Sequence, residues 1–180
     1  MRSEVHKLCP KLLVTVRTGK DSRGIEEIAD ALFTHDPNVK VISTKFRGVL
    51  LVYTDLPSTD AFKILSTTPP SVAERIVRVD TCVKTDLESI SNAVLKLVSN
   101  YSFETFYVDC IRRGRYVESS HEVEKYIGAV IVSKLKKHVC ISCADIIIKI
   151  EIVDDITLIS IMKPGEDKSF KKRIRFKLKT

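Results

Sequence analysis

Glutamine is absent from this 180-residue sequence and asparagine is scarce, whereas isoleucine, valine, lysine and glutamate are plentiful. This bias is typical of thermophile proteins, which avoid thermolabile amides. Long apolar runs are also missing: the most apolar stretch, ADIIIKIEIV, is interrupted by Lys149 and Glu151, so it is not expected to cross a membrane. The first residues, MRSEVHKLCP, contain no apolar segment typical of a secretory signal. We therefore expect a soluble, cytoplasmic protein with no membrane partner.

Common catalytic motifs do not occur in the sequence. It contains no phosphate-binding P-loop, no G-x-G-x-x-G, no H-E-x-x-H and no G-x-S-x-G, and six glycines are few for a loop that cradles a nucleotide. The four histidines are scattered, and none has the spacing of metal ligands. We therefore expect a protein that is not an enzyme, with no catalytic residues, no cofactor and no bound metal.

Cys140 and Cys143, in the stretch CISC, are the one constellation that could carry covalent or metal chemistry. A zinc site needs four ligands, and the other three cysteines stand alone in the sequence. A disulfide or a redox pair remains open, because intracellular disulfides occur in hyperthermophiles. We favour a third interpretation, in which both cysteines are small apolar residues that lead into a strand.

Basic residues gather at the C-terminal end of the chain. The whole sequence has 30 lysines and arginines against 23 acidic residues, a net charge of +7 and a pI near 9.2. Residues 163–180 alone carry eight basic and two acidic side chains, so the rest of the chain is nearly neutral. Such a basic end favours nucleic acid or an acidic protein surface as the partner, and solubility alone is the alternative. Within it, RIRFKLK (173–179) alternates basic and apolar residues, which predicts a strand with one basic face.

The first half of the chain has the pattern of a ferredoxin-like domain. Alternating apolar residues predict a strand at 11–17, and apolar residues at helical spacing predict a helix that ends near Pro37. Two β-rich runs meet at Arg47-Gly48 as a hairpin, STDAFKILST forms a short helix, and SVAERIVRVDTCV (71–83) returns as one strand. Strand–helix–strand–strand–helix–strand is the ferredoxin-like order, which we predict for residues 8–84.

The second half predicts a further mixed α/β unit. Capping boxes that begin at Thr85 and Ser119 mark the starts of two helices. ETFYVDCIRR is a strand between these helices, and ADIIIKIEIV and ITLISIM flank a hairpin turn at Asp154-Asp155. The apolar residues of the second helix predict a buried stripe, which consists of Val123, Ile127, Val130, Ile131 and Leu135.

Three arginines surround one glycine in CIRRGRYVESS, between that strand and the second helix. The start of a helix attracts anions through its unpaired N–H groups and its positive dipole end. Guanidinium groups beside it suggest an anionic ligand; the alternative, which stays open, is that the arginines form a solvated loop. Strand alternation places Arg112 and Arg113 on opposite faces, so we expect at least one of them not to touch the ligand.

The stretch FYVDCIRRGRYVESSHEVEKYIGAVIVSKLKKHVCISCADIIIKIEIVDD resembles a THUMP domain. The family's pattern is a strand ending in basic residues, a short loop, and a Ser-capped helix with a Gly-Ala pair, here Gly128-Ala129. An Asp and an alternating Ile/Val strand follow, here from Asp145 to Val153; the family often has Pro-Asp where this chain has Cys-Ala-Asp. A ferredoxin-like domain ahead of the THUMP domain is the family's usual arrangement, so the resemblance covers about residues 8–162.

The resemblance implies an α/β fold of the α+β type in three parts: a ferredoxin-like domain at 8–84, a THUMP-like RNA-binding domain at 85–165, and a basic strand or tail at 166–180. It implies recognition of the acceptor stem and 3′ end of tRNA. Since we expect no catalytic domain, the chain is similar to the stand-alone branch, in which a non-catalytic adaptor helps a separate acetyltransferase make N4-acetylcytidine in tRNA.

The predicted RNA-binding residues are the basic and hydroxyl side chains of the arginine loop, the lysines at the far end of the following helix and the basic residues of the tail: Arg112, Arg113, Arg115, Ser119, Ser120, Lys136, Lys137, Lys171, Lys172, Arg173 and Arg175. Two alternatives stay open. One is a thiol-dependent tRNA-modifying enzyme that uses Cys140 or Cys143. The other is a protein-interaction module with incidental RNA affinity, whose basic strand adds to the edge of a partner's sheet.

Overall fold

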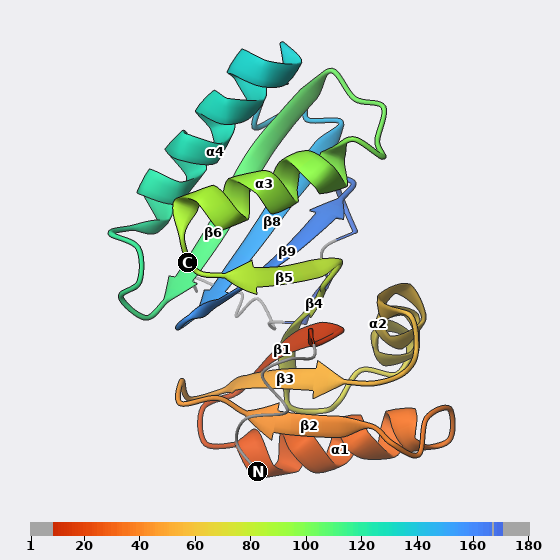
Figure 1. Ribbon diagram of the computed structural model, residues 1–180. Helices are drawn as coiled ribbons and strands as arrows, with labels where there is room; N and C mark the ends of the chain where they lie inside the picture. The colour runs from red at the N-terminus through yellow and green to blue at the C-terminus, as the bar shows by residue number, and fades with distance from the viewer. Residues whose placement is uncertain (1–8, 167, 171–180) are drawn as a thin grey trace, which may run out of the picture.

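The computed structural model describes residues 9–166 and 168–170, which form two five-stranded sheets and four helices (Figure 1). Residues 12–78 and a short strand at Lys168–Ser169 build one sheet, residues 81–162 build the other, and two helices cover one face of each. This arrangement confirms the predicted mixed α/β fold class. In the described ranges, no helix has both the length and the apolar character needed to span a membrane.

The first half of the chain has the predicted ferredoxin-like order. Its elements are β1 (Leu12–Val16), α1 (Asp21–Phe33), β2 (Lys40–Ser43), β3 (Val49–Tyr53), α2 (Ser58–Thr67) and β4 (Ala73–Arg78). The antiparallel strands lie in the order β4-β1-β3-β2, and the short β10 (Lys168–Ser169) pairs with β4 at the outside. Successive side chains of β1 point to opposite faces of the sheet. Leu12 and Val14 pack against the helices, whereas Leu13 packs on the other face.

The hairpin predicted at Arg47-Gly48 is present, and its turn requires glycine. Gly48 has φ of 72°, and a Cβ at this position would lie 2.6 Å from the Val16 carbonyl oxygen. The Gly48 N–H also donates a 2.8 Å hydrogen bond to Asp21 at the start of α1. These contacts fix the β2–β3 turn, which carries Lys45 and Arg47.

The single strand predicted at 71–83 is wrong, because the structure divides it between the two sheets. β4 ends at Arg78, and β5 (Thr81–Lys84) becomes an edge strand of the second sheet. The chain passes from one sheet to the other at Asp80. Its N–H donates to the Ile159 carbonyl and its carboxylate accepts the Ile161 N–H. The carboxylate also pairs with Arg78 at 2.9 Å. The division of the chain into domains at 84/85 and 165/166 stays a prediction.

The second sheet has the strand order β5-β9-β8-β6-β7. Its elements after β5 are α3 (Leu87–Val98), β6 (Thr105–Arg113), α4 (Ser120–Leu135), β7 (His138–Val139), β8 (Ile146–Val153) and β9 (Ile156–Met162). β6 runs parallel to β8, and the predicted Asp154-Asp155 turn joins β8 to the antiparallel β9. Figure 1 shows α3 and α4 side by side across one face, over a core that contains Phe106, Ile148 and Ile150.

The helix starts in this half were predicted with mixed success. Ser119 caps α4 as expected, because its hydroxyl accepts the Glu122 N–H at 3.0 Å. The prediction that Thr85 caps α3 is wrong, since the cap is Asp86, which accepts the Ser89 N–H at 2.7 Å. Thr85 is instead buried against Thr157. The predicted stripe of α4 also ends early, because the side chain of Leu135 is 37% exposed.

A third apolar cluster lies between the two sheets, on the faces that the helices leave uncovered. Leu13, Leu51 and Val77 of the first sheet pack there with Val153 and Leu158 of the second. The two halves therefore share buried apolar surface, which holds the ends of their strands and loops in fixed positions relative to each other.

Candidate nucleic-acid interface

The loop between β6 and α4 is held by the guanidinium of Arg112. Arg112 Nη1 donates to the carbonyl oxygens of Gly114 at 2.7 Å and Val117 at 3.3 Å, which closes the loop on itself. Gly114 has φ of 109°, and a Cβ there would lie 3.0 Å from Asp154 Cα in the β8–β9 turn. Arg112 thus shapes the loop that presents the next residues to solvent.

Arg113 points to the opposite face of the sheet, as strand alternation predicted, and enters a buried ion network. Its Nη1 lies 2.6 Å from Glu151 Oε2, and Arg75 of β4 lies 2.5 Å from Glu151 Oε1. The Glu151 side chain is 1% exposed, so two arginines from different sheets share one buried carboxylate. A buried carboxylate needs such partners to offset the loss of its hydration. Arg113 therefore helps to join the two halves of the molecule.

Arg115 and Tyr116, at the tip of the same loop, are exposed to solvent. They line an open groove together with Lys45 and Phe46 of the first half and with Asp154. Lys45 pairs with Asp154 at 2.6 Å and stays 62% exposed, with its ammonium 5.5 Å above the Phe46 ring. The groove thus gathers cationic and aromatic side chains from both halves of the chain.

Arg47 extends this cationic surface into a neighbouring groove, which is also lined by Arg75 and Arg113. We call Lys45, Arg47 and Arg115 the cation rim; all three are exposed. Sequence reasoning found Arg115 and missed Lys45 and Arg47. The stretch KFRG predicts only a hairpin turn, and nothing in the sequence shows that this turn lies beside the β6–α4 loop.

Ser119 and Ser120 lie at the start of α4, beside the same loop. The Ser119 hydroxyl accepts the Glu122 N–H, and the Ser120 hydroxyl accepts the Arg112 N–H at 3.1 Å. The Ser119 hydroxyl still has a proton to donate, whereas the Ser120 hydroxyl also forms a hydrogen bond with the Cys110 thiol. The Glu122 carboxylate accepts the Glu118 N–H at 2.9 Å, so an acidic side chain also lies at this end of the helix.

Lys136 and Lys137 lie at the other end of α4 and are not brought together with the cation rim. The helix has 16 residues and is about 24 Å long. Lys136 is exposed and ends the helix in the left-handed conformation, with φ of 59°. Lys137 pairs with Glu104 at 2.7 Å and lies over the Phe103 ring. The other predicted RNA-binding residues lie outside the described ranges: Lys171, Lys172, Arg173 and Arg175.

The structure gives the cysteines other roles than the interpretation favoured from the sequence. Cys140 and Cys143 form a disulfide in an exposed loop, so the interpretation of these residues as small apolar strand residues is wrong. A second disulfide joins Cys9 to Cys82, two cysteines that stand 73 residues apart in the sequence. Cys110 is free and buried, and burial raises the pKa of its thiol to about 12. In the described ranges no group of three or more His, Cys, Asp and Glu side chains could hold a metal ion.

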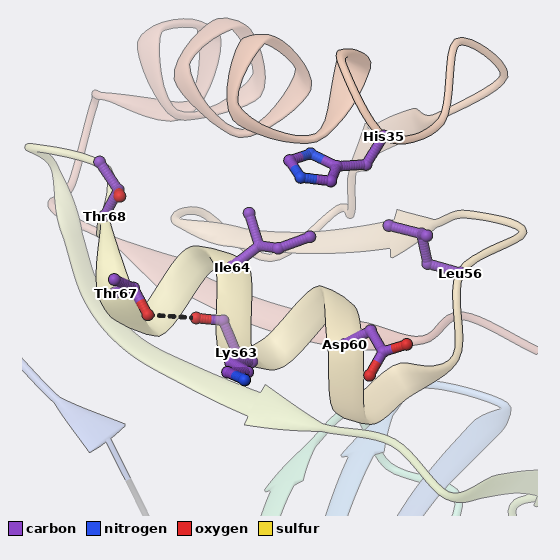
Figure 2. A pocket seen from close by; sticks show the side chains of 7 residues that line it. All are labelled: His35, Leu56, Asp60, Lys63, Ile64, Thr67 and Thr68. Carbon is purple, nitrogen blue, oxygen red and sulfur yellow. Dashed lines mark hydrogen bonds between the residues drawn. The ribbon is translucent and has the colours of Figure 1, made fainter.

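A further groove lies on the first half, between the end of α1 and α2 (Figure 2). His35 faces Ile64 across it, and Asp60 and Lys63 of α2 add one charge of each sign. None of the predicted RNA-binding residues that the structure describes lines this groove. Lys63 is therefore an exposed cation outside the candidate interface.

Residues 84–162 match the THUMP domain family, and this part of the chain is a THUMP domain. It contains the β6–α4 loop, the buried carboxylate of Glu151 and both ends of α4.

The chain is also similar to larger proteins. Over 103 residues it is 31% identical to a tRNA sulfurtransferase of Vibrio cholerae, a match that covers 54% of this chain and 20% of that protein. The crystal structure of PH1313 from Pyrococcus horikoshii has a TM-score of 0.67 at 20% identity, over 86% of this chain and 55% of that one. A 4-thiouridine synthetase crystallised with RNA and ATP has a TM-score of 0.53 at 17% identity, over 86% of this chain and 41% of that one. The two structures share the fold, and the chain spans a fifth to about half the length of these relatives.

Proposed function

We propose that this protein binds tRNA and acts as a non-catalytic adaptor, which presents the acceptor stem and 3′ end to a separate modification enzyme such as an N4-acetylcytidine acetyltransferase. The THUMP domain and the identity with a tRNA sulfurtransferase support tRNA as the ligand and tRNA modification as the process. The observation that carries the binding site is the cation rim, in which both halves of the chain contribute exposed cations to one open surface.

Some side chains of the β6–α4 loop contact the RNA, and others hold the loop in position. Arg115 contacts a phosphate directly, with Lys45 and Arg47 as neighbours. Arg112 and Arg113 act as positioning residues, because their guanidinium groups are bound to the loop carbonyls and to Glu151. Ser119 donates its hydroxyl proton to the same phosphate or the next one, and Ser120 supports the loop through its bonds to the Arg112 N–H and the Cys110 thiol.

Further contacts extend the interface beyond this loop. Lys136 and Lys137 reach the RNA at the far end of α4, and the tail is proposed from the sequence alone to add phosphate contacts through Lys171, Lys172, Arg173 and Arg175. Contacts of this kind fix the register of an RNA without reading bases. Duplex RNA is recognised through shape, phosphates and 2′-hydroxyls, which suits a protein that binds many tRNAs at one site.

Two single substitutions test the site, Arg115→Ala and Lys45→Ala. We expect each to lower tRNA affinity about tenfold at low salt, which is the value of one charge-assisted hydrogen bond. Each should also flatten the log–log dependence of affinity on salt by about 0.7 to 0.9, because one phosphate contact is lost. Fluorescence anisotropy with labelled tRNA measures both quantities.

Lys63→Ala is the matched control, since it removes the same charge from an exposed position outside the interface. Unchanged affinity in both test variants, or an equal loss in the control, would place the RNA elsewhere on the molecule. Circular dichroism of each variant shows whether the fold is intact.

A further inference from the structure

The disulfide Cys140–Cys143 differs from the other cysteines in its exposure. It lies in the loop 140–145 between β7 and β8, where Cys143 is exposed and the side chain of Ile141 is 78% exposed. Cys9 and Cys82 are partly covered and pack against the apolar cluster between the sheets. Cys110 is buried. One disulfide of the two in the described ranges is therefore open to a macromolecular reagent.

The loop is anchored at both ends by bonds that do not involve sulfur. The Cys140 N–H donates to the Phe106 carbonyl at 2.9 Å, and the Asp145 N–H donates to the Thr105 carbonyl at 3.0 Å. The Asp145 carboxylate accepts the N–H groups of Glu104 at 2.8 Å and Thr105 at 2.9 Å. These backbone bonds lower the pKa of Asp145, so the anchor is a carboxylate that stays ionised at neutral pH. Opening the disulfide leaves these anchors in place.

The two sulfurs are not equivalent. The Cys143 N–H donates to Cys140 Sγ at 3.1 Å, and Cys140 is partly covered whereas Cys143 is exposed. A backbone N–H aimed at a sulfur stabilises negative charge there and so favours that sulfur as the leaving thiolate. An incoming thiolate therefore reaches Cys143 more easily, and Cys140 is the better leaving group because the Cys143 N–H stabilises its thiolate.

We propose that Cys140–Cys143 is a thiol–disulfide exchange site whose reactant is a protein dithiol. A thiolate of the dithiol attacks Cys143 Sγ, the S–S bond breaks, and its electron pair goes to Cys140 Sγ, which takes up a proton. The second thiol of the partner loses its proton and attacks the partner sulfur of the mixed disulfide, releasing Cys143 as a thiolate that is then protonated. Two electrons pass to this protein, the partner becomes a disulfide, and the reverse sequence oxidises the pair again.

This proposal is independent of tRNA binding, and its test contains no RNA. The full-length native protein is incubated with reduced thioredoxin, and alkylation followed by mass spectrometry measures each cysteine over time. We expect Cys140 and Cys143 to become alkylated at least about tenfold faster than Cys9 and Cys82, because thiol exchange depends on access to the sulfur. Equal rates for the two disulfides would overturn the proposal. Reduction of Cys140–Cys143 by dithiothreitol but not by thioredoxin would overturn the protein dithiol as its reactant.

A trapping experiment tests which sulfur is attacked. A thioredoxin whose second active-site cysteine is replaced by serine stops at the mixed disulfide, and peptide mapping identifies the residue joined to it. We expect Cys143, whereas a linkage at Cys140 would contradict the assignment. The variant with both Cys140→Ser and Cys143→Ser is the control and should give no trapped complex; its circular dichroism should match that of the unmodified protein, because the loop keeps its backbone anchors.

Discussion

Glu151 joins the two halves of the molecule through one carboxylate. It is almost completely buried, and each of its oxygens pairs with an arginine from a different sheet. Such a network contributes little beyond a well-packed apolar cluster while it is complete, but it is costly to break, because the remaining charges stay partly buried without a counter-charge. The same carboxylate holds Arg113 at the base of the proposed RNA-binding loop.

Replacing this carboxylate by a neutral amide tests the network at the scale of one residue. We expect Glu151→Gln to lower the free energy of unfolding by about 3 kcal/mol, because Arg75 and Arg113 lose their shared counter-charge. Urea unfolding followed by circular dichroism measures the change. Glu26→Gln, at an exposed position of α1, is the control and should shift stability by no more than about 0.5 kcal/mol. A loss below about 1 kcal/mol at Glu151 would mean that the apolar cluster alone holds the sheets together.

At the scale of the element, α4 runs from the cation rim to Lys136 and Lys137. At its C-terminal end a residue with a side chain occupies a backbone conformation that favours glycine. Lys136 ends the helix with φ of 59°, a conformation in which a Cβ is unfavourable. Glycine is the residue that helices most often use at such a position. The chain places a lysine there, which is consistent with a role for its charge in the proposed interface.

Lys136→Gly should therefore stabilise the protein by about 0.5 to 1 kcal/mol. Lys134→Gly, two residues earlier and inside the same helix, removes the same charge and should destabilise by about 1 kcal/mol. Thermal unfolding of the two variants compares them directly. The same sign of change in both would show that the left-handed conformation at Lys136 imposes no cost.

The elements themselves were largely predictable, because alternation and helical spacing depend on neighbouring residues. The ferredoxin-like order, the Ser119 cap and the Asp154-Asp155 turn all follow from local patterns that the structure confirms. The division of the chain at Asp80 could not be predicted from such local patterns, because the alternation of apolar residues continues from Val77 through Val79 without a visible break. The division depends on contacts distant in sequence: Asp80 and β5 bond to β9, some 80 residues away, whereas β4 pairs with β1.

The candidate interface was predictable only in part, for the same reason. Arg115 could be found because the arginines cluster in sequence next to a helix start. The inward roles of Arg112 and Arg113 depend on the Val117 carbonyl and on Glu151, and the contribution of Lys45 depends on how the two sheets pack. The Cys9–Cys82 pairing is likewise a property of the folded chain, since 73 residues separate the two cysteines.

At the scale of the whole molecule, the apolar cluster between the sheets brings cations of two small units to one surface. Leu13, Val77 and Leu158 of this cluster keep the β2–β3 turn beside the β6–α4 loop, so that cations separated by about 70 positions in sequence face one groove. A rigid cationic surface of this kind suits a duplex RNA end, whose phosphates lie at fixed spacings.

The central claim, that this surface binds the acceptor end of tRNA, is tested most directly by comparing two ligands. The affinity of the purified protein is measured for an intact tRNA and for the same tRNA trimmed of its 3′ single-stranded end, at two salt concentrations. Our account predicts a preference of about tenfold or more for the intact tRNA that persists at the higher salt concentration, because contacts other than phosphates contribute to it. Equal binding of both ligands, with a steep loss of affinity in salt, would contradict the account and show only the attraction of a basic protein for a polyanion.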